Sequence, residues 1–309
     1  MPFTLNENNY LSNLTNLCLQ VLTFDNLQFT NRFGVFARQY TKYGDKIACV
    51  NAWVKDGVDY NLGDDTFDNP YNADKPNAYE KTISTKLKKR YSLQLSEELL
   101  KGAFEDENSL QMFLSTLIKQ LKTKSEIDIY EMVVNDFATI DMTSLLGSGY
   151  RNIEGSTETQ EDVVDLYTKI IETAQAMKLP NNIYGLTEAS NGTIETTCAE
   201  DTRLILFVTP KLFSKINTYV NASLYNSSDI ALNKWIDEVR VVDVESNPSI
   251  GEGTVHGYLV TEDVYRYSPR IQTVREQPNA GNLTFNYFYH VWTNAGFTGA
   301  GQLAYIYEA

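Results

Sequence analysis

The feature that most constrains this chain is a strict alternation of side-chain polarity between Tyr79 and Leu95. Every even position from Glu80 to Gln94 is polar, whereas most odd positions are apolar. A period of two indicates an extended strand with one apolar face. At about 3.3 Å per residue such a strand would reach roughly 55 Å, which is much longer than a usual strand.

A second strand-like stretch, Lys46–Val54, precedes the alternating one. The segment between them contains the turn-forming residues Gly57, Gly63, Pro70 and Pro76. We therefore expect residues 46–95 to form one long hairpin. Because a ribbon of this length cannot be buried within its own domain, we also expect it to reach another subunit.

Charge is unevenly distributed around this predicted hairpin. The segment Asp56–Asp74 holds six acids and no base, whereas the segment Lys75–Lys101 holds seven bases and three acids. Two interpretations stay open: two solvated patches, or an acidic loop that meets the basic strand of a neighbouring subunit. On the second interpretation, the candidate inter-subunit contacts are the acids Asp56, Asp59, Asp64, Asp65, Asp68 and Asp74 and the bases Lys81, Lys86, Lys88, Lys89 and Arg90.

The remainder of the chain mixes predicted helices with predicted strands. Apolar residues at helical spacing from Leu110 to Leu121, after a capping box at Asn108, predict a long helix, whole or broken, that continues to Phe137. Thr159 with Asp162 predicts the start of another helix, and Thr209-Pro210 the start of a short one. Further expected elements are a helix at Ser228–Trp235 and strands at Arg203–Val208, Val239–Val244, Tyr258–Val260, Leu283–Trp292 and Leu303–Tyr307, with a subdomain junction at Gly147–Gly155.

Composition excludes several classes of protein. A net charge of −14 argues against a direct nucleic-acid binder, which needs a basic face, although it allows a protein that lies beside DNA. Cys18, Cys49 and Cys198 are widely spaced and odd in number, so we expect no disulfide framework. Neither an apolar run of membrane-spanning length nor a secretory signal is present, so we expect the protein to stay in the cytoplasm where it is made.

Residues suited to catalysis are scarce. His256 and His290 are the only histidines, the first in a predicted turn and the second in an aromatic strand. The usual nucleotide-binding, hydrolase and metalloprotease motifs are missing, so we expect no catalytic, cofactor or metal site. The aromatic cluster at Phe285–Trp292 lacks interleaved Lys or Arg, which favours a buried sheet or a subunit interface over a base-stacking platform.

The order of these segments resembles the Hong Kong 97 (HK97) fold of tailed-phage major capsid proteins. The stretch Val260–Trp292 resembles the capsid proteins of short-tailed phages of the phi-29 group, in which an aromatic NYxYHVW-type strand follows a VR-x-P turn. The matching residues are Val274, Arg275, Pro278, Asn286, Tyr287, Tyr289, His290, Val291 and Trp292. Tyr79–Phe104 is similar as well.

This resemblance implies an α+β, HK97-like capsid fold. It assigns residues 1–45 to an N-terminal arm and 46–95 to the E-loop and its adjoining strand. Residues 96–154 would form the first part of the P-domain with its spine helix, 155–250 the A-domain, and 251–309 the C-terminal sheet of the P-domain. Because the chain stops at Ala309, we expect no additional C-terminal immunoglobulin-like domain.

The resemblance also implies a function. The chain would be a major capsid protein that self-assembles, as pentamers and hexamers, into the icosahedral head shell around phage double-stranded DNA. The shell would enclose that DNA without sequence-specific binding, the chain would not associate with membranes, and assembly would need a separate scaffolding protein and a portal. Assembly would take place in the host cytoplasm, and the product would reside in the virion. The alternatives are an encapsulin-type nanocompartment shell and, from a different class, a small-molecule enzyme with an unrecognised acid/base site.

Overall fold

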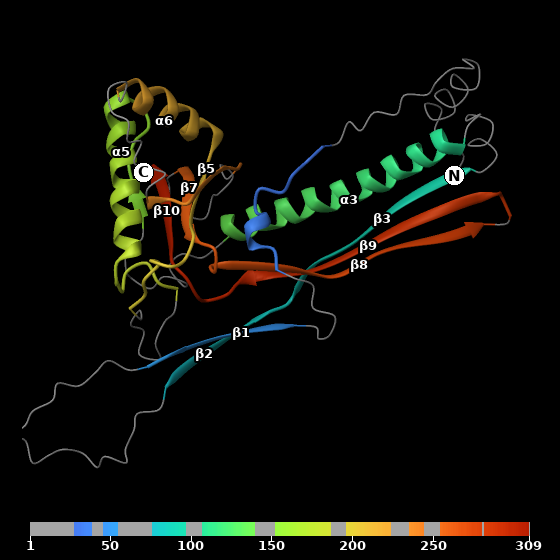
Figure 1. Cartoon of the computed structure of the whole chain (residues 1–309), viewed down its shortest axis with the longest axis horizontal. Coiled ribbons are helices and arrows are strands. Elements are labelled where there is room, and N and C mark those ends of the chain that lie inside the picture. The colour runs from blue at the N-terminus through green and yellow to red at the C-terminus, as the bar shows by residue number, and fades with distance from the viewer. Residues whose placement is uncertain are drawn as a thin grey trace, which may run out of the picture.

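The structure is a computed structural model of the chain. It describes residues 28–38, 46–54, 76–96, 107–139, 152–186, 196–223, 235–243, 254–279 and 281–308. Within these ranges it contains a three-stranded sheet beside one long helix, a five-stranded sheet with two further helices, and a two-stranded ribbon (Figure 1). None of the helices in the described part of the chain is long and apolar enough to cross a membrane.

The long helix α3 (Glu107–Ala138) lies along a sheet of order β3-β9-β8, as Figure 1 shows. Its strands are β3 (Thr85–Ser96), β9 (Thr284–Phe297) and β8 (Tyr265–Asn279), and all are antiparallel. Odd-numbered residues of β3 and β9, such as Leu87 and Val291, are buried in one cluster with residues of α3. The predicted long helix is thus confirmed, and it is continuous.

The second sheet has the order β4-β10-β7-β5-β6. Its strands are β4 (Asn152–Glu154), β10 (Leu303–Glu308), β7 (Thr254–Thr261), β5 (Leu204–Val208) and β6 (Glu238–Val241). Every residue of β5 is buried, as its continuous apolar run predicts for a strand covered on both faces. Ile205 and Phe207 belong to the core that α3 shares, whereas Leu204, Leu206 and Val208 belong to the core with α5 and α6.

Helices α5 (Gln160–Lys178) and α6 (Pro210–Ser223) begin where the sequence predicts. Thr159 and Asp162 form a complete capping box in which each side chain accepts the other residue's backbone N–H. In α5 the apolar residues Val163, Tyr167, Ile170, Ala174 and Met177 are all buried. At the start of α6, the carbonyl of Thr209 accepts the backbone N–H of Phe213 at 3.0 Å.

An aromatic cluster joins the helix, both sheets and the N-terminal segment. Phe33 precedes the short 3-10 helix η1 (Gly34–Phe36), and Phe36 is its last residue. Both side chains are fully buried. Their rings lie 4.9 Å and 5.6 Å from the ring of Phe207 in β5, and 6.2 Å and 6.0 Å from that of Phe137 in α3. The N-terminal segment is therefore part of the core, which its sequence does not signal.

The predicted single hairpin over residues 46–95 is wrong in its second half. The ribbon pairs β1 (Ile47–Trp53) with β2 (Asn77–Ile83), but the alternating stretch then passes Ser84 and continues as β3 in another sheet. Strand β3 forms its hydrogen-bonded pairs with β9 and packs its apolar side chains beside α3. It therefore belongs to the body of its own subunit. Only the β1–β2 portion therefore projects from the body (Figure 1).

Three further expectations need correction. Val274, Arg275 and Pro278 lie inside strand β8 and not in a turn. A strand with prolines is possible there because β8 is an edge strand, whose outer N–H groups need no partner in the sheet. Residues 251–309 do not form one sheet, since β7 and β10 join the five-stranded sheet. His256 lies in β7, not in a turn.

Candidate functional site

The β1–β2 ribbon stands apart from the two larger sheets (Figure 1). Its register runs from the pair Ile47–Ile83 at the base to the pair Trp53–Asn77 at the tip. Ile83 is buried at the base. Gly299 has a positive φ of 74°, and a Cβ there would lie 3.0 Å from Cε1 of Tyr79, so this loop closely supports the ribbon.

One face of β1 is apolar and exposed. Its residues alternate between half-buried and exposed positions, and Ala48, Val50 and Ala52 are all exposed. Val50 is 63% exposed, and Val54, just beyond the strand, is 81% exposed. An isolated two-stranded ribbon is marginally stable in water, and exposed apolar surface often marks an interaction site. This face is therefore a candidate interface.

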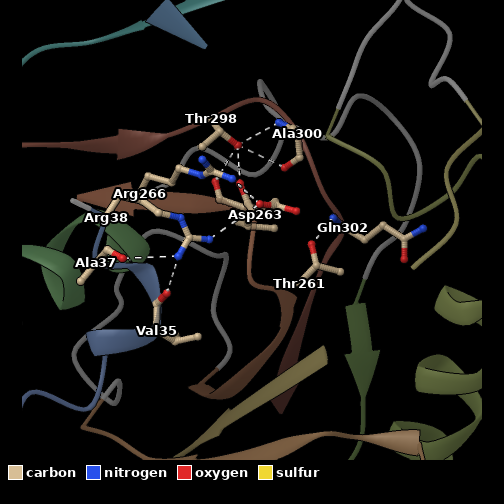
Figure 2. Close-up of polar contacts among 10 residues, drawn as sticks. Val35, Ala37, Arg38, Thr261, Asp263, Arg266, Thr298, Ala300 and Gln302 are labelled. Carbon is tan, nitrogen blue, oxygen red and sulfur yellow. Dashed lines mark hydrogen bonds and ion pairs between the residues drawn. The ribbon is translucent and has the colours of Figure 1, made fainter. Parts of the chain in front are cut away.

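A polar network holds the loop on which the ribbon rests (Figure 2). The carboxylate of Asp263 pairs with Arg266 and, at 3.9 Å, with Arg38 of the N-terminal segment. The hydroxyl of Thr298 donates to the carbonyl of Asp263 at 2.5 Å and accepts the backbone N–H of Ala300 at 3.1 Å. The backbone N–H of Gln302 donates to the hydroxyl of Thr261 at 3.0 Å. The network lines a cavity of about 630 Å³ between β1 and the body.

The structure places the predicted basic residues on more than one face. Lys81 is on β2, whereas the other four are on β3. Lys86 pairs with Asp136 and Lys89 with Asp128, both at 2.7 Å, and both aspartates belong to α3. Lys88 and Arg90 lie over the rings of Trp292 and Phe288 at 5.3 Å and 5.5 Å. The acids between Asp56 and Asp74 lie outside the described residues, so their pairing stays a prediction.

Tyrosines reinforce the two ion pairs between α3 and the sheet. The hydroxyl of Tyr265 donates to Asp136 at 2.5 Å, and that of Tyr91 donates to Asp128. Burial, together with the nearby carboxylates, raises the pKa of both tyrosines. Lys86 and Lys89 thus take part in attaching the helix to the sheet of their own subunit.

His256 is a buried histidine that contacts a carboxylate. It is 2% exposed, and its Nε2 lies 2.8 Å from Oε2 of Glu308. Glu308 also accepts the backbone N–H of Thr157 at 2.9 Å and the hydroxyl of Ser156 at 3.1 Å. Burial raises the pKa of Glu308, but these hydrogen bonds outweigh it and lower the pKa to about 2. The described residues hold no cluster of His, Cys, Asp and Glu suited to a metal ion.

We expect the Glu308 contact to stabilise the fold above about pH 5 and to lose its effect as the pH falls toward 2. The folded carboxyl has a pKa below its usual 4.5, so the unfolded chain binds more protons in this window. After allowance for solvent screening, Glu308→Gln should lower the free energy of unfolding at pH 7 by about 1–2 kcal/mol and by much less near pH 2. Urea unfolding at several pH values, with the exposed Glu200→Gln as control, measures this difference. An equal loss at every pH would contradict it.

Comparisons with known proteins agree on one family. The chain matches the model of Phi29-like phage major capsid proteins over residues 1–298. It is 23% identical over 224 residues to the major capsid protein of Bacillus phage PZA, covering 70% of this chain and 45% of that one. For the major capsid protein of Bacillus phage GA-1, identity is 21% over 206 residues, covering 65% and 40%. The chain thus aligns with less than half the length of these curated relatives.

Solved capsid structures share the fold. The capsid structure of Staphylococcus phage Andhra superimposes with a TM-score of 0.70 and 10% identity, covering 95% of this chain and 88% of that one. The capsid structure of cyanophage P-SCSP1u gives 0.57 and 12% identity, covering 96% and 94%. At these identities the likeness shows the fold alone, and it confirms the predicted α+β, HK97-like capsid fold.

Proposed function

Because the chain belongs to the Phi29-like phage major capsid protein family, we propose that it is a major capsid protein that assembles with copies of itself into a phage head shell. The observation that carries this proposal is the family match over residues 1–298. The capsid fold, shared over 95% of the chain with a phage capsid structure, supports it. The shell would reside in the virion, be built in the host cytoplasm, and enclose double-stranded DNA without reading its sequence.

The segments would then have distinct roles in the shell. The β1–β2 ribbon with residues 54–76 would be the E-loop, and residues 1–45 the N-terminal arm. Helix α3 with the β3-β9-β8 sheet would form the P-domain. The five-stranded sheet with α5 and α6 would form the A-domain, which includes β7 and β10 in addition to the expected residues 155–250. Assembly into pentamers and hexamers would require a separate scaffolding protein and a portal.

The proposed contact between subunits follows from the ribbon. Its tip pair, Trp53 and Asn77, brackets the segment that contains the six acids. The exposed apolar face of the ribbon would be buried against a neighbouring subunit. The negatively charged acids would attract the basic strand of that neighbour. A closed shell repeats each contact many times, so individually modest contacts are sufficient.

We expect assembly to depend on salt. Charge pairs exposed to solvent are screened at high ionic strength, where the Debye length falls to about 3 Å at 1 M. Shells formed at low salt should therefore dissociate, or form more slowly, as NaCl approaches molar concentration. Light scattering of the full chain, assembled with its phage's scaffolding protein, over a NaCl series measures this. A flat response from low to molar salt would contradict the charge contribution.

Size-exclusion chromatography of the full chain, expressed with and without its phage's scaffolding protein, tests the proposed function. A shell protein should elute in the megadalton range, whereas a folded 35.1 kDa monomer in both preparations would contradict the proposal. Copurifying cargo enzymes in small uniform shells would instead indicate a nanocompartment. The family and fold comparisons favour neither that alternative nor a small-molecule enzyme.

A further inference from the structure

The cavity between β1 and the body has walls from four separate parts of the chain. Residues 47–51 of β1 form one wall, and the other walls come from residues between 197 and 202, between 261 and 266, and between 298 and 302. Its described lining includes no residue of β2, so the cavity lies on the body side of the ribbon. Its volume of about 630 Å³ is in the range of small-molecule sites. We call this space the ribbon cavity.

Three buried polar atoms of the residues that line the ribbon cavity have no hydrogen-bond partner among the described residues. They are Nδ2 of Asn51, Nε of Arg266 and Oε1 of Gln302. Buried polar groups are nearly always hydrogen-bonded, because a donor or acceptor that has lost water without gaining a partner costs free energy. Three such atoms around one cavity indicate that the cavity has an occupant.

Gln302 defines what one end of the occupant must offer. The residue is 1% exposed, and its Nε2 donates to the hydroxyl of Thr197 at 2.8 Å. Its backbone N–H donates to the hydroxyl of Thr261, so the residue is held at both its main chain and its amide nitrogen. The amide oxygen is left as an acceptor. An occupant must therefore bring an N–H or O–H donor to this end of the cavity.

Asn51 and Arg266 define what the other end must offer. Nδ2 of Asn51 lies beside Gly299, where a Cβ would be 3.6 Å away, and a glycine has no side chain to accept its hydrogen bond. Arg266 uses Nη2 for its pair with Asp263, which leaves Nε as a second donor. Two N–H donors, one of them on a permanently charged guanidinium group, match the oxygens of a carboxylate.

The charges around the ribbon cavity favour the same group. Burial raises the pKa of the Cys49 thiol, and the nearby charges of Arg266 and Lys81 oppose that rise, so both cations lie close to the β1 wall. Asp263 is the one acid among the described lining residues, and it is shared between Arg266 and Arg38. The excess of cations gives this end of the cavity a positive potential, which attracts an anion.

We propose that the ribbon cavity binds a small, extended molecule with a carboxylate at one end and an ammonium or hydroxyl group at the other. The carboxylate accepts hydrogen bonds from Asn51 and Arg266, and the ammonium or hydroxyl group donates to Oε1 of Gln302. The molecule must be extended, because the Gln302 side chain and Arg266 lie on opposite sides of Asp263 (Figure 2). Once bound, it joins the β1–β2 ribbon to the body of the same subunit.

Calorimetric titration of the unassembled full chain with 5-aminopentanoate, which has the proposed groups at its two ends, tests the site. We expect saturable binding to one site with a Kd of about 1 mM or lower, as a ligand of this size allows. Pentanoate keeps the carboxylate but lacks the ammonium group. It should bind at least about tenfold more weakly, because it leaves the oxygen of Gln302 unpaired.

A matched pair of variants tests the other end. Asn51→Asp replaces the donor with a carboxylate of similar size and should weaken binding of 5-aminopentanoate by about tenfold or more, because like charges then meet. Asn77→Asp makes the same change on the paired strand β2, outside the cavity, and should leave the Kd within about twofold. Circular dichroism of both variants shows whether they fold as the unmutated chain does.

Cys49 lines the cavity and provides a natural probe of its occupancy. Alkylation by iodoacetamide, followed for each cysteine by mass spectrometry of its peptide, should slow at Cys49 by about fivefold when the ligand is at about four times its Kd. The measurement uses the unassembled chain, so it holds whether or not the protein forms shells.

Three results would overturn the proposal. Neither saturable binding nor protection of Cys49 would mean that ordered water satisfies the unpaired atoms. Pentanoate that binds as tightly as 5-aminopentanoate, or an Asn51→Asp chain that binds as tightly as the unmutated one, would show that the ligand does not contact these residues. Protection of Cys49 in assembled shells without added ligand, together with no protection by ligand in the free chain, would mean that a neighbouring copy fills the cavity.

Discussion

Deletion of residues 56–74 should leave a subunit that folds normally but fails to form shells. The deleted segment joins the paired ends Trp53 and Asn77 at the tip of the ribbon, and the residues of both described core clusters lie outside that ribbon. Its removal therefore takes away no described core contact, while it removes six acids proposed to bind a neighbour. The expected result is an unchanged thermal unfolding midpoint together with the loss of megadalton particles.

A matched variant separates charge from length. Replacement of all six aspartates of the segment by asparagine keeps the length of the loop and removes its negative charge. If charge carries the contact, this variant should be nearly as defective as the deletion at physiological salt. Sedimentation of assembled particles measures both variants. Shells like those of the unmutated protein from the deletion would rule out the proposed role of the segment.

Phe137→Ala should cause the largest loss of stability of any single change considered. Phe137 is 1% exposed, and its ring lies 5.2 Å from Tyr258, 5.5 Å from Tyr265 and 5.1 Å from Phe297. The residue thus contacts α3's neighbours in both sheets. Removal of a buried phenylalanine ring leaves a cavity and costs about 3–5 kcal/mol.

Urea unfolding followed by circular dichroism measures this cost. Met112→Ala provides the control on the same helix, since Met112 is 65% exposed and should change stability by less than about 0.5 kcal/mol. Because shells form from folded subunits, Phe137→Ala should also lower shell yield at 37 °C. A loss below about 1 kcal/mol would show that the aromatic cluster does not join the two sheets as described.

Local signals in the sequence predict several elements correctly. The capping box at Thr159, the Thr209-Pro210 pair and the apolar run in β5 each depend on neighbours in sequence, and each appears as expected. The helical spacing of apolar residues that predicts α3 is also a local pattern. These patterns are predictable because hydrogen bonding and periodic burial act within a few residues.

Features set by pairing between distant strands are not predictable in this way. The alternating stretch gives no sign that it changes sheets at Ser84, since both halves need the same period. Strand β8 contains Pro269 and Pro278, and proline is disfavoured in a strand unless the strand lies at the edge of its sheet. Only the fold shows that β8 is an edge strand. The burial of Phe33 and Phe36 depends on β5 and α3, which follow much later in the chain.

The candidate interface also combines features that are local in sequence with features that depend on contacts between distant segments. Sequence alone identifies the acids and bases, but not that Lys86 and Lys89 pair with aspartates of α3. Nor does it show that Arg270 lies over Trp292 or that Arg275 pairs with Phe288. Cross-strand register decides these neighbours. The aromatic strand at Phe285–Trp292 is thus flanked by cations in space although not in sequence.

Electron microscopy of negatively stained particles, purified after expression of the full chain with its phage's scaffolding protein, tests the central claim most directly. We predict closed icosahedral shells of uniform diameter that contain this chain as their main protein. A folded chain that forms only monomers, small oligomers or open irregular aggregates, in preparations where the scaffolding protein is present, would contradict the assignment as a capsid subunit.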